Sequence, residues 1–67
     1  MDRKMVIPAE LPRYGITIGD RQRRRLESLG EFPKRIPLTG RSHAYSEGEI
    51  SAFIEGKIAA RDGAEAA

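Results

Sequence analysis

The chain has 67 residues, of which 39% are hydrophobic and 33% are charged. A chain this short holds one small domain, which we place over residues 1–67 with an ordered core at about 6–61 and flexible ends. No cysteine is present, which excludes disulfides and thiolate chemistry and fits a reducing compartment. No apolar stretch approaches the ~20 residues that span a bilayer, and the N-terminus has no apolar signal core. We therefore expect a soluble cytoplasmic protein.

Charge is distributed unevenly along the chain. Residues 1–45 carry ten basic and five acidic side chains, a net charge of +5, whereas residues 46–67 carry two basic and five acidic side chains, a net charge of −3. Nine of the twelve basic residues are arginine, whose planar guanidinium suits phosphates and the edges of guanine. This pattern predicts a polyanionic partner for the first part of the chain.

The residue types needed for catalysis are scarce. His43 is the single histidine, cysteine is absent, and the seven glycines are scattered rather than grouped in a phosphate-binding loop. So small a domain also has little room for a ligand cleft beside its core. We expect no enzymatic activity, no metal, no cofactor and no small-molecule substrate.

The first predicted elements precede residue 16. Residues 5–7 form a short apolar run that predicts an edge strand. Pro8 at a first helical position and Glu10 in the first turn favour a helix after it. Because Pro12 removes a backbone donor and clashes with the preceding turn, we expect this helix to be short or irregular and to end near residues 14–15.

A basic helix is predicted over residues 21–29. Asp20 or Gly19 can cap its start, and Gly30 can close its end. The apolar residues Leu26 and Leu29 are expected to face the core, with Gln22 or Arg23 continuing their stripe. The side chains left mainly outward are Arg21, Arg24, Arg25 and Ser28.

A hairpin is predicted after this helix. Phe32 is the expected core residue of the connection, and residues 34–38 and 43–45 read as two strands around a turn at 39–42. His43 is interpreted as an ordinary strand residue. The aromatic residues expected to pack in the core, rather than to stack on bases, are Tyr14, Phe32, Tyr45 and Phe53.

The last predicted helix has the clearest signals. Ser46 and Glu49 have the spacing of a capping box. One apolar stripe follows at helical spacing, formed by Ile50, Phe53, Ile54 and Ile58. We expect this helix to end at about Arg61 and the tail from Gly63 to be loose.

The predicted fold is mainly α with a small β-hairpin, in the order helix, turn, helix, hairpin, helix, which is that of a winged helix-turn-helix. Residues 30–35 and 45–54 resemble the small AlpA-like prophage regulators and excisionases, whose domain is MerR-like, and the resemblance spans about Pro8 to Asp62. Tyr45 and Phe53 stand where the family usually has tryptophan or another aromatic residue. The chain departs from the family at Gly19-Asp20, where Ser or Thr is common, and at Arg23 and Arg24, where apolar residues are usual. A charged Arg23 is predicted to weaken the packing of its helix, although its stem can cover apolar surface.

The resemblance implies binding of double-stranded DNA, with the second helix in the major groove and the hairpin tip at the adjacent minor groove or backbone. We expect Arg21 and Arg24 to contact the edges of bases, Gln22 to contact adenine, and Arg25 and Lys34 to contact phosphates. The candidate DNA-binding residues of the helix are Arg21, Gln22, Arg24, Arg25 and Ser28. Those of the wing and backbone are Lys34, Arg35, Thr39, Gly40, Arg41 and Ser42.

Two activities are implied by the resemblance. Our main hypothesis is an excisionase, or recombination directionality factor, which binds near an attachment site and biases an integrase toward excision. The alternatives are an AlpA-like transcriptional regulator of prophage or mobile-element genes and a protein-interaction module that does not bind DNA. The predicted partners are therefore DNA, an integrase and neighbouring copies of the chain, which the acidic last helix is expected to contact. We expect a bacterial or phage origin and a location at the nucleoid.

Overall fold

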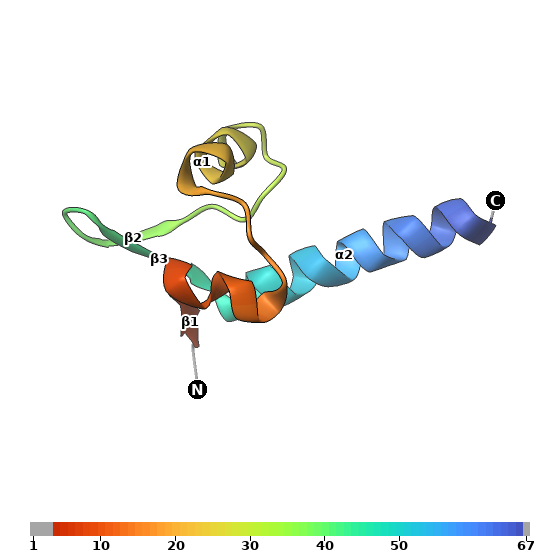
Figure 1. The fold of residues 1–67 in the computed structure, drawn as a ribbon, viewed down its shortest axis with the longest axis horizontal. Helices are drawn as coiled ribbons and strands as arrows, with labels where there is room; N and C mark the ends of the chain where they lie inside the picture. Colours follow the sequence, from red (N-terminus) through yellow and green to blue (C-terminus); the bar gives the residue numbers. More distant parts are fainter. Residues whose placement is uncertain (1–3, 67) are drawn as a thin grey trace.

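The computed structural model describes residues 4–66, and Figure 1 shows their arrangement. The predicted order of elements is confirmed, with the first helix of the 3-10 type and a third strand in the sheet. The predicted flexible ends include residues 1–3 and 67, which lie outside the described residues. The elements are β1 (Met5–Val6), η1 (Pro8–Tyr14), α1 (Asp20–Ser28), β2 (Ile36–Thr39), β3 (Ser42–Ser46) and α2 (Glu47–Ala66).

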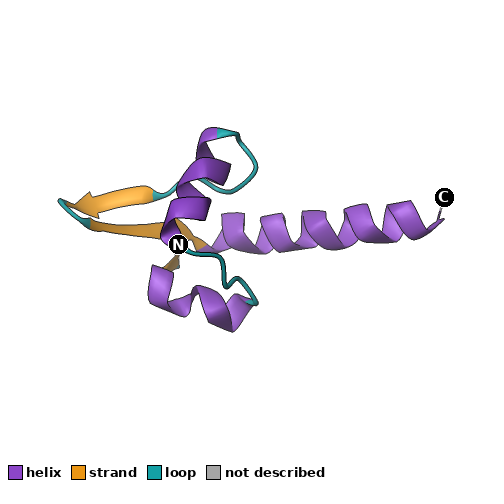
Figure 2. Cartoon of the chain, turned by 45° about the horizontal axis from the view of Figure 1, so that its top comes forward, coloured by secondary structure: helices purple, strands orange, loops and turns teal. Residues whose placement is uncertain are grey.

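The sheet is antiparallel with the strand order β1-β3-β2. Val6 lies opposite Tyr45, which joins the start of the chain to the base of the hairpin. β2 and β3 pair from Ile36 opposite Ala44 to Thr39 opposite Ser42 and form the wing. The wing and α2 extend from opposite ends of the body (Figure 2). The predicted edge strand and hairpin are thus confirmed, and β1 forms one edge of the three-stranded sheet.

The two prolines shape η1 as expected. Pro8 starts it and Pro12 lies within it, and the element remains a 3-10 helix with tighter turns than an α-helix. The Glu10 carboxylate accepts a hydrogen bond from the Ile7 N–H at 3.1 Å, which fixes the entry of the chain. Gly15 then ends the helix in the left-handed conformation, at φ +82°.

The end of α1 follows the predicted glycine cap. The Gly30 N–H bonds to the Glu27 carbonyl at 3.1 Å, and the Glu31 N–H bonds to the Leu26 carbonyl at 2.8 Å. These two bonds form a Schellman motif, in which the residue after the helix adopts a positive φ. Gly30 has φ +75°, a conformation that glycine adopts without strain.

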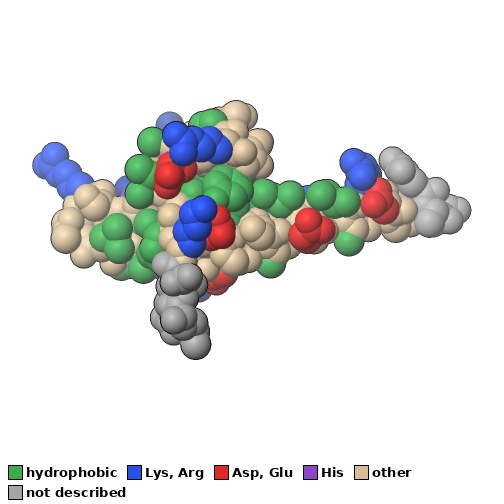
Figure 3. Space-filling view, turned by 90° about the horizontal axis from the view of Figure 1, so that it is seen from below, with side chains coloured by type: hydrophobic (Ala, Val, Ile, Leu, Met, Phe, Trp, Pro, Cys, Tyr) green, Lys and Arg blue, Asp and Glu red, His purple; other side chains and the backbone are tan. Residues whose placement is uncertain are grey.

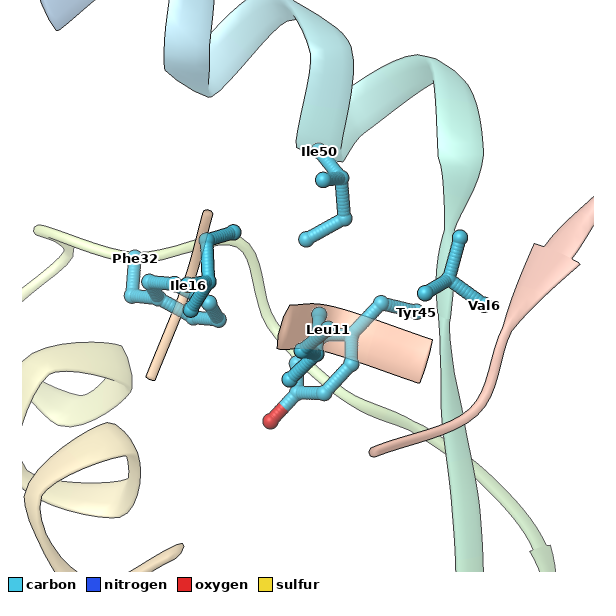
Figure 4. Packing of buried hydrophobic residues seen from close by; sticks show 6 residues of the cluster. All are labelled: Val6, Leu11, Ile16, Phe32, Tyr45 and Ile50. Atoms are coloured by element: carbon cyan, nitrogen blue, oxygen red, sulfur yellow. The ribbon is translucent and has the colours of Figure 1, made fainter. Parts of the chain in front are cut away.

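The core lies between η1, β3 and the start of α2 (Figure 4). Phe32 meets Tyr45 edge to face at a ring-centroid distance of 5.4 Å and Phe53 at 4.9 Å. Such aromatic pairs contribute roughly 0.5–1.5 kcal/mol beyond their buried area. The prediction that the aromatic residues belong to the core is confirmed. The buried residues of the cluster are Val6, Leu11, Ile16, Phe32, Tyr45 and Ile50.

The predicted inward face of α1 is partly wrong. Leu26 packs against the core, but Leu29 is 59% exposed. Leu29 is the C-cap residue, so the chain turns away at this position instead of adding another inward residue. The buried face is formed by Arg23 and Glu27, which are four residues apart on the same side of the helix.

α2 is longer than predicted, since it continues beyond Arg61 to Ala66. A glycine inside a helix costs about 1 kcal/mol relative to alanine but does not by itself end the helix, so Gly63 is accommodated. Ile50 is buried, whereas Ile58 is 39% exposed because the helix has left the body by then. Figure 3 shows hydrophobic side chains continuing from the body onto this projecting helix.

The start of α2 retains part of its predicted cap, because the Ser46 Oγ accepts a hydrogen bond from the Glu49 N–H at 3.4 Å. Among residues 4–66, no helix combines the length and the apolar character needed to cross a membrane.

Candidate nucleic-acid interface

The outer surface of α1 is polar and basic. At 3.6 residues per turn, Arg21 and Arg25 point most directly away from the buried Arg23 and Glu27, with Ser28 and Gln22 on either side of them. Arg24 lies on the side of the helix shared with Asp20, and Gln22 lies on the opposite side. The structure exposes every helix residue predicted to contact DNA, namely Arg21, Gln22, Arg24, Arg25 and Ser28.

Arg23 turns the other way and is only 6% exposed. Its Nη1 donates to the Ile18 carbonyl at 3.1 Å, and its Nε donates to the Tyr45 hydroxyl at 3.3 Å. A buried guanidinium is costly unless its donors find partners, and here they do. The sequence predicts that Arg23 weakens the packing of its helix, and the structure shows that its hydrogen bonds tie α1 to β3.

Glu27 holds the start of the wing against α1. Its carboxylate accepts bonds from the Nε and Nη2 of Arg35, both at 2.9 Å, and from the Arg35 N–H at 3.1 Å. The Tyr45 hydroxyl adds a bond at 2.8 Å. Burial raises the pKa of Glu27, but the bonds from Arg35 and Tyr45 outweigh this and leave the pKa below its usual value. The carboxylate is therefore charged and fully engaged.

Asp20 closes the same network at the start of α1. Its carboxylate accepts bonds from the Arg24 Nε at 2.8 Å and from the Arg23 Nη2 at 3.3 Å, and lies 3.1 Å from the Arg35 Nη1. The bond from Arg24, followed by Arg35, lowers the pKa of Asp20. We call these bonded side chains the α1–wing clasp, which consists of Asp20, Arg23, Glu27, Arg35 and Tyr45.

The sequence analysis does not predict the clasp. Glu27 lies four residues after Arg23, which puts both on one helix face, and this spacing is the signal in the sequence that points to it. Arg35 was predicted to contact DNA, but its side chain is 19% exposed and its guanidinium is bonded to Glu27 and Asp20. The structure thus places Arg35 behind the basic surface.

The remaining wing candidates are accessible. Lys34 is exposed in the segment before β2. Figure 3 shows basic side chains at the end of the wing as well as over the body. The residues at the wing tip, all exposed, are Thr39, Gly40, Arg41 and Ser42. The structure therefore presents two basic surfaces, on α1 and on the wing, joined by the clasp.

The comparisons with known proteins identify the family. The family model described as prophage CP4-57 regulatory protein (AlpA) matches residues 22–58, more than half of the chain. The chain belongs to the AlpA family. The matched residues include most of α1, the whole wing and the first part of α2. The comparison with curated proteins found no match, and neither did the comparison with solved structures.

AlpA proteins form a regulatory, non-catalytic family, and membership in it implies DNA binding. The resemblance stated from the sequence is therefore confirmed. Where the AlpA family commonly has Ser or Thr at the start of α1, this chain has Gly19 as the N-cap and Asp20 as the first helical residue. That departure supplies the carboxylate at the surface end of the clasp.

His43 lies beside the clasp in this AlpA protein. Its ring meets Tyr45 edge to face at 5.7 Å, and its Nε2 is buried without a hydrogen-bond partner, 3.9 Å from the Asp20 Oδ1. Burial lowers the pKa of His43, and the nearby Arg35 lowers it further. No group of three His, Cys, Asp or Glu residues within the described part of the chain could hold a metal.

Glu47, at the start of the AlpA domain's last helix, contacts other elements of the protein. Glu47 accepts a hydrogen bond from the Tyr14 hydroxyl at 2.7 Å and lies 3.3 Å from the Lys4 Nζ. These contacts lower the pKa of Glu47, with Tyr14 the larger cause. They tie η1 and the chain before β1 to the start of α2.

Proposed function

We propose that this protein is a sequence-specific DNA-binding regulator of prophage genes, with α1 in the major groove and the wing tip at the adjacent minor groove or backbone. One observation carries the proposal: Arg21 and Arg25 are exposed on the outer side of α1 and Arg24 is exposed on its flank beside Asp20, and the clasp holds the orientation of this helix to the wing. Three like charges on one helix repel each other. A polyanion that neutralises them removes this cost.

The dimensions of α1 agree with this docking. Nine residues make a helix of about 14 Å, and the major groove of B-form DNA, about 12 Å wide, admits an α-helix. Arg21 and Arg24 are proposed to meet base edges, Gln22 to meet adenine, and Arg25 to meet phosphate.

The wing supplies the second part of the proposed interface. Arg41 at its tip is proposed to enter the minor groove. The residues proposed to bind the phosphate backbone around it are Lys34, Thr39, Gly40 and Ser42. Arg35 is proposed to position the wing through the clasp rather than to touch DNA, because Glu27 and Asp20 already engage its guanidinium.

We infer that the 67 residues act as one DNA-binding unit on the chromosome of a bacterial host. We propose gene regulation ahead of excision because the matching family is described as a prophage regulatory protein. Excisionase activity stays a second proposal, since a protein that covers a site can affect both a polymerase and an integrase. An excision assay with the integrase of the same element, with and without this protein, separates the two activities.

Fluorescence anisotropy tests the DNA proposal. The protein is titrated onto duplexes from the regulatory region of the host element and onto randomised duplexes, at about 50 and 200 mM salt. With Arg25 and Lys34 as the two basic phosphate contacts, affinity should fall roughly 12-fold between these concentrations. Arg24→Ala should weaken binding to the preferred duplex by about tenfold or more and change binding to random duplexes far less.

Arg61→Ala is the matched control, because it removes an arginine that is exposed on the projecting part of α2. It should leave sequence preference unchanged. If the wild-type protein fails to bind any duplex at the lower salt concentration, the DNA proposal is wrong. A search for a protein partner would then follow.

A further inference from the structure

The Asp20 carboxylate occupies an unusual place for a DNA-binding surface. It lies in the first turn of α1 next to Arg21 and Arg24, and its side chain is 45% exposed. A carboxylate favours the positive end of a helix, yet it also repels the DNA phosphates that such a helix end would otherwise attract. We expect its negative charge to lower affinity for DNA of any sequence.

The carboxylate is held from behind by the core. Tyr45 is completely buried and bonds to Glu27, and Glu27 in turn binds Arg35 in a two-pronged contact. The other end of the Arg35 guanidinium lies 3.1 Å from Asp20. A chain of hydrogen bonds and ion pairs therefore runs from the core to the surface and fixes where the Asp20 carboxylate lies.

Arg24 is the exposed end of this chain. Its Nε donates to the Asp20 Oδ2 at 2.8 Å, while the side chain remains 70% exposed. Among contacts between the described residues, Arg24 is hydrogen-bonded through its Nε. The N–H groups of its terminal nitrogens, Nη1 and Nη2, are left to bind another partner. A free arginine has many rotamers, whereas this one is oriented before DNA arrives.

We propose that Asp20 is a specificity-determining residue, which orients Arg24 so that its terminal nitrogens read a guanine in the major groove. Guanine presents two acceptors there, O6 and N7, and a guanidinium fork matches both. Asp20 thus lowers binding to DNA of any sequence through phosphate repulsion and raises the preference for guanine at one position. This inference rests on the proposed function and names the base that the site recognises.

The test uses the full chain and duplexes that carry each possible base pair at every position of the preferred site. The wild-type protein should prefer guanine at one position by about tenfold or more. Asp20→Ala should reduce that preference to about twofold or less, leave the other positions unchanged, and raise affinity for random duplexes several-fold. Asp20→Asn keeps the size and a neutral acceptor, so it should raise random binding similarly and reduce the guanine preference less.

Two comparisons separate this role from a structural one. Asp62→Asn changes the net charge by the same amount as Asp20→Asn on the projecting part of α2, and it should leave the preference at every position unchanged. Arg24→Ala should lose preference at the same position as Asp20→Ala. The double variant should lose no more than Arg24→Ala alone, because the two side chains act as one unit.

Full guanine preference in Asp20→Ala would overturn the inference while leaving the proposed function intact. An equal loss of preference at all positions would also overturn it, because this result indicates a distorted domain. If the wild-type protein binds no duplex, both the inference and the proposed function are wrong.

Discussion

The His43 side chain is 16% exposed and lies next to cations, which makes the domain sensitive to mild acid. Burial lowers its pKa below the ordinary value of about 6.5, Arg35 and Arg23 lower it further, and Asp20 and Glu27 oppose them. Between the folded and unfolded pKa values, the unfolded chain binds more protons, so stability decreases as the pH decreases. His43 therefore has no effect above about pH 7 and destabilises the fold below about 6.5.

We predict that the free energy of unfolding of the wild-type protein falls between pH 7.5 and 5.5, by at most about 1.4 kcal/mol per pH unit. Chemical denaturation at a series of pH values measures this. His43→Gln should remove the dependence in this range. Both proteins should lose stability again below about pH 4.5, because the clasp lowers the pKa of Asp20 and Glu27. Equal slopes for both proteins above pH 5.5 would contradict the assignment to His43.

At the scale of an element, the end of α1 depends on one backbone conformation. Gly30 has φ +75° and an added Cβ would meet no atom within 4 Å, so alanine there would be strained only through its backbone. We predict that Gly30→Ala destabilises the fold by about 1–2 kcal/mol, the cost of a left-handed conformation for an L-residue. Thermal or chemical denaturation provides the measurement.

Gly56→Ala is the matched control for Gly30→Ala. Gly56 also has open space around its Cβ position, but it lies inside α2 at an ordinary φ. Because alanine favours a helix interior over glycine by about 0.5–1 kcal/mol, Gly56→Ala should stabilise the protein. If both variants change stability in the same direction, the backbone conformation at Gly30 is not the cause.

At the scale of the whole molecule, the clasp determines how α1 and the wing can meet DNA together. If Arg35 bound a phosphate, its loss would reduce the slope of log affinity against log salt by about 1. The structure places its guanidinium against Glu27 and Asp20 instead. We predict that Arg35→Ala weakens DNA binding and lowers the unfolding midpoint but leaves the salt slope unchanged.

The exposed Arg25 provides the contrast for Arg35. Arg25→Ala should reduce the salt slope by about 1 and leave the unfolding midpoint nearly unchanged. Anisotropy titrations at several salt concentrations, paired with thermal denaturation, measure both quantities. If Arg35→Ala reduces the slope of log affinity against log salt, Arg35 contacts a phosphate, as the sequence predicts.

The sequence alone determined the order of the elements and the family, because these depend on local signals. Pro12 lies within a first helix that stays of the 3-10 type, Gly30 closed the second helix, and the Ser46 cap started the last one, each through the backbone of a few neighbouring residues. The exposed α1 residues could also be predicted, since helical spacing places polar side chains on one side. Family membership followed from the same local patterns.

The sequence left open whether Gln22 or Arg23 faces inward, and only the tertiary structure decided for Arg23 and added Glu27 and Arg35. Arg23, Glu27 and Arg35 have the same chemistry as the arginines and acids on the surface, and their burial depends on partners far along the chain, above all Tyr45. A buried charge is tolerated where fixed partners satisfy it, and local pattern does not reveal such partners. The extension of α2 beyond Arg61 was also decided outside the local pattern. Gly63 disfavours a helix, but whether the helix ends there depends on the surrounding structure.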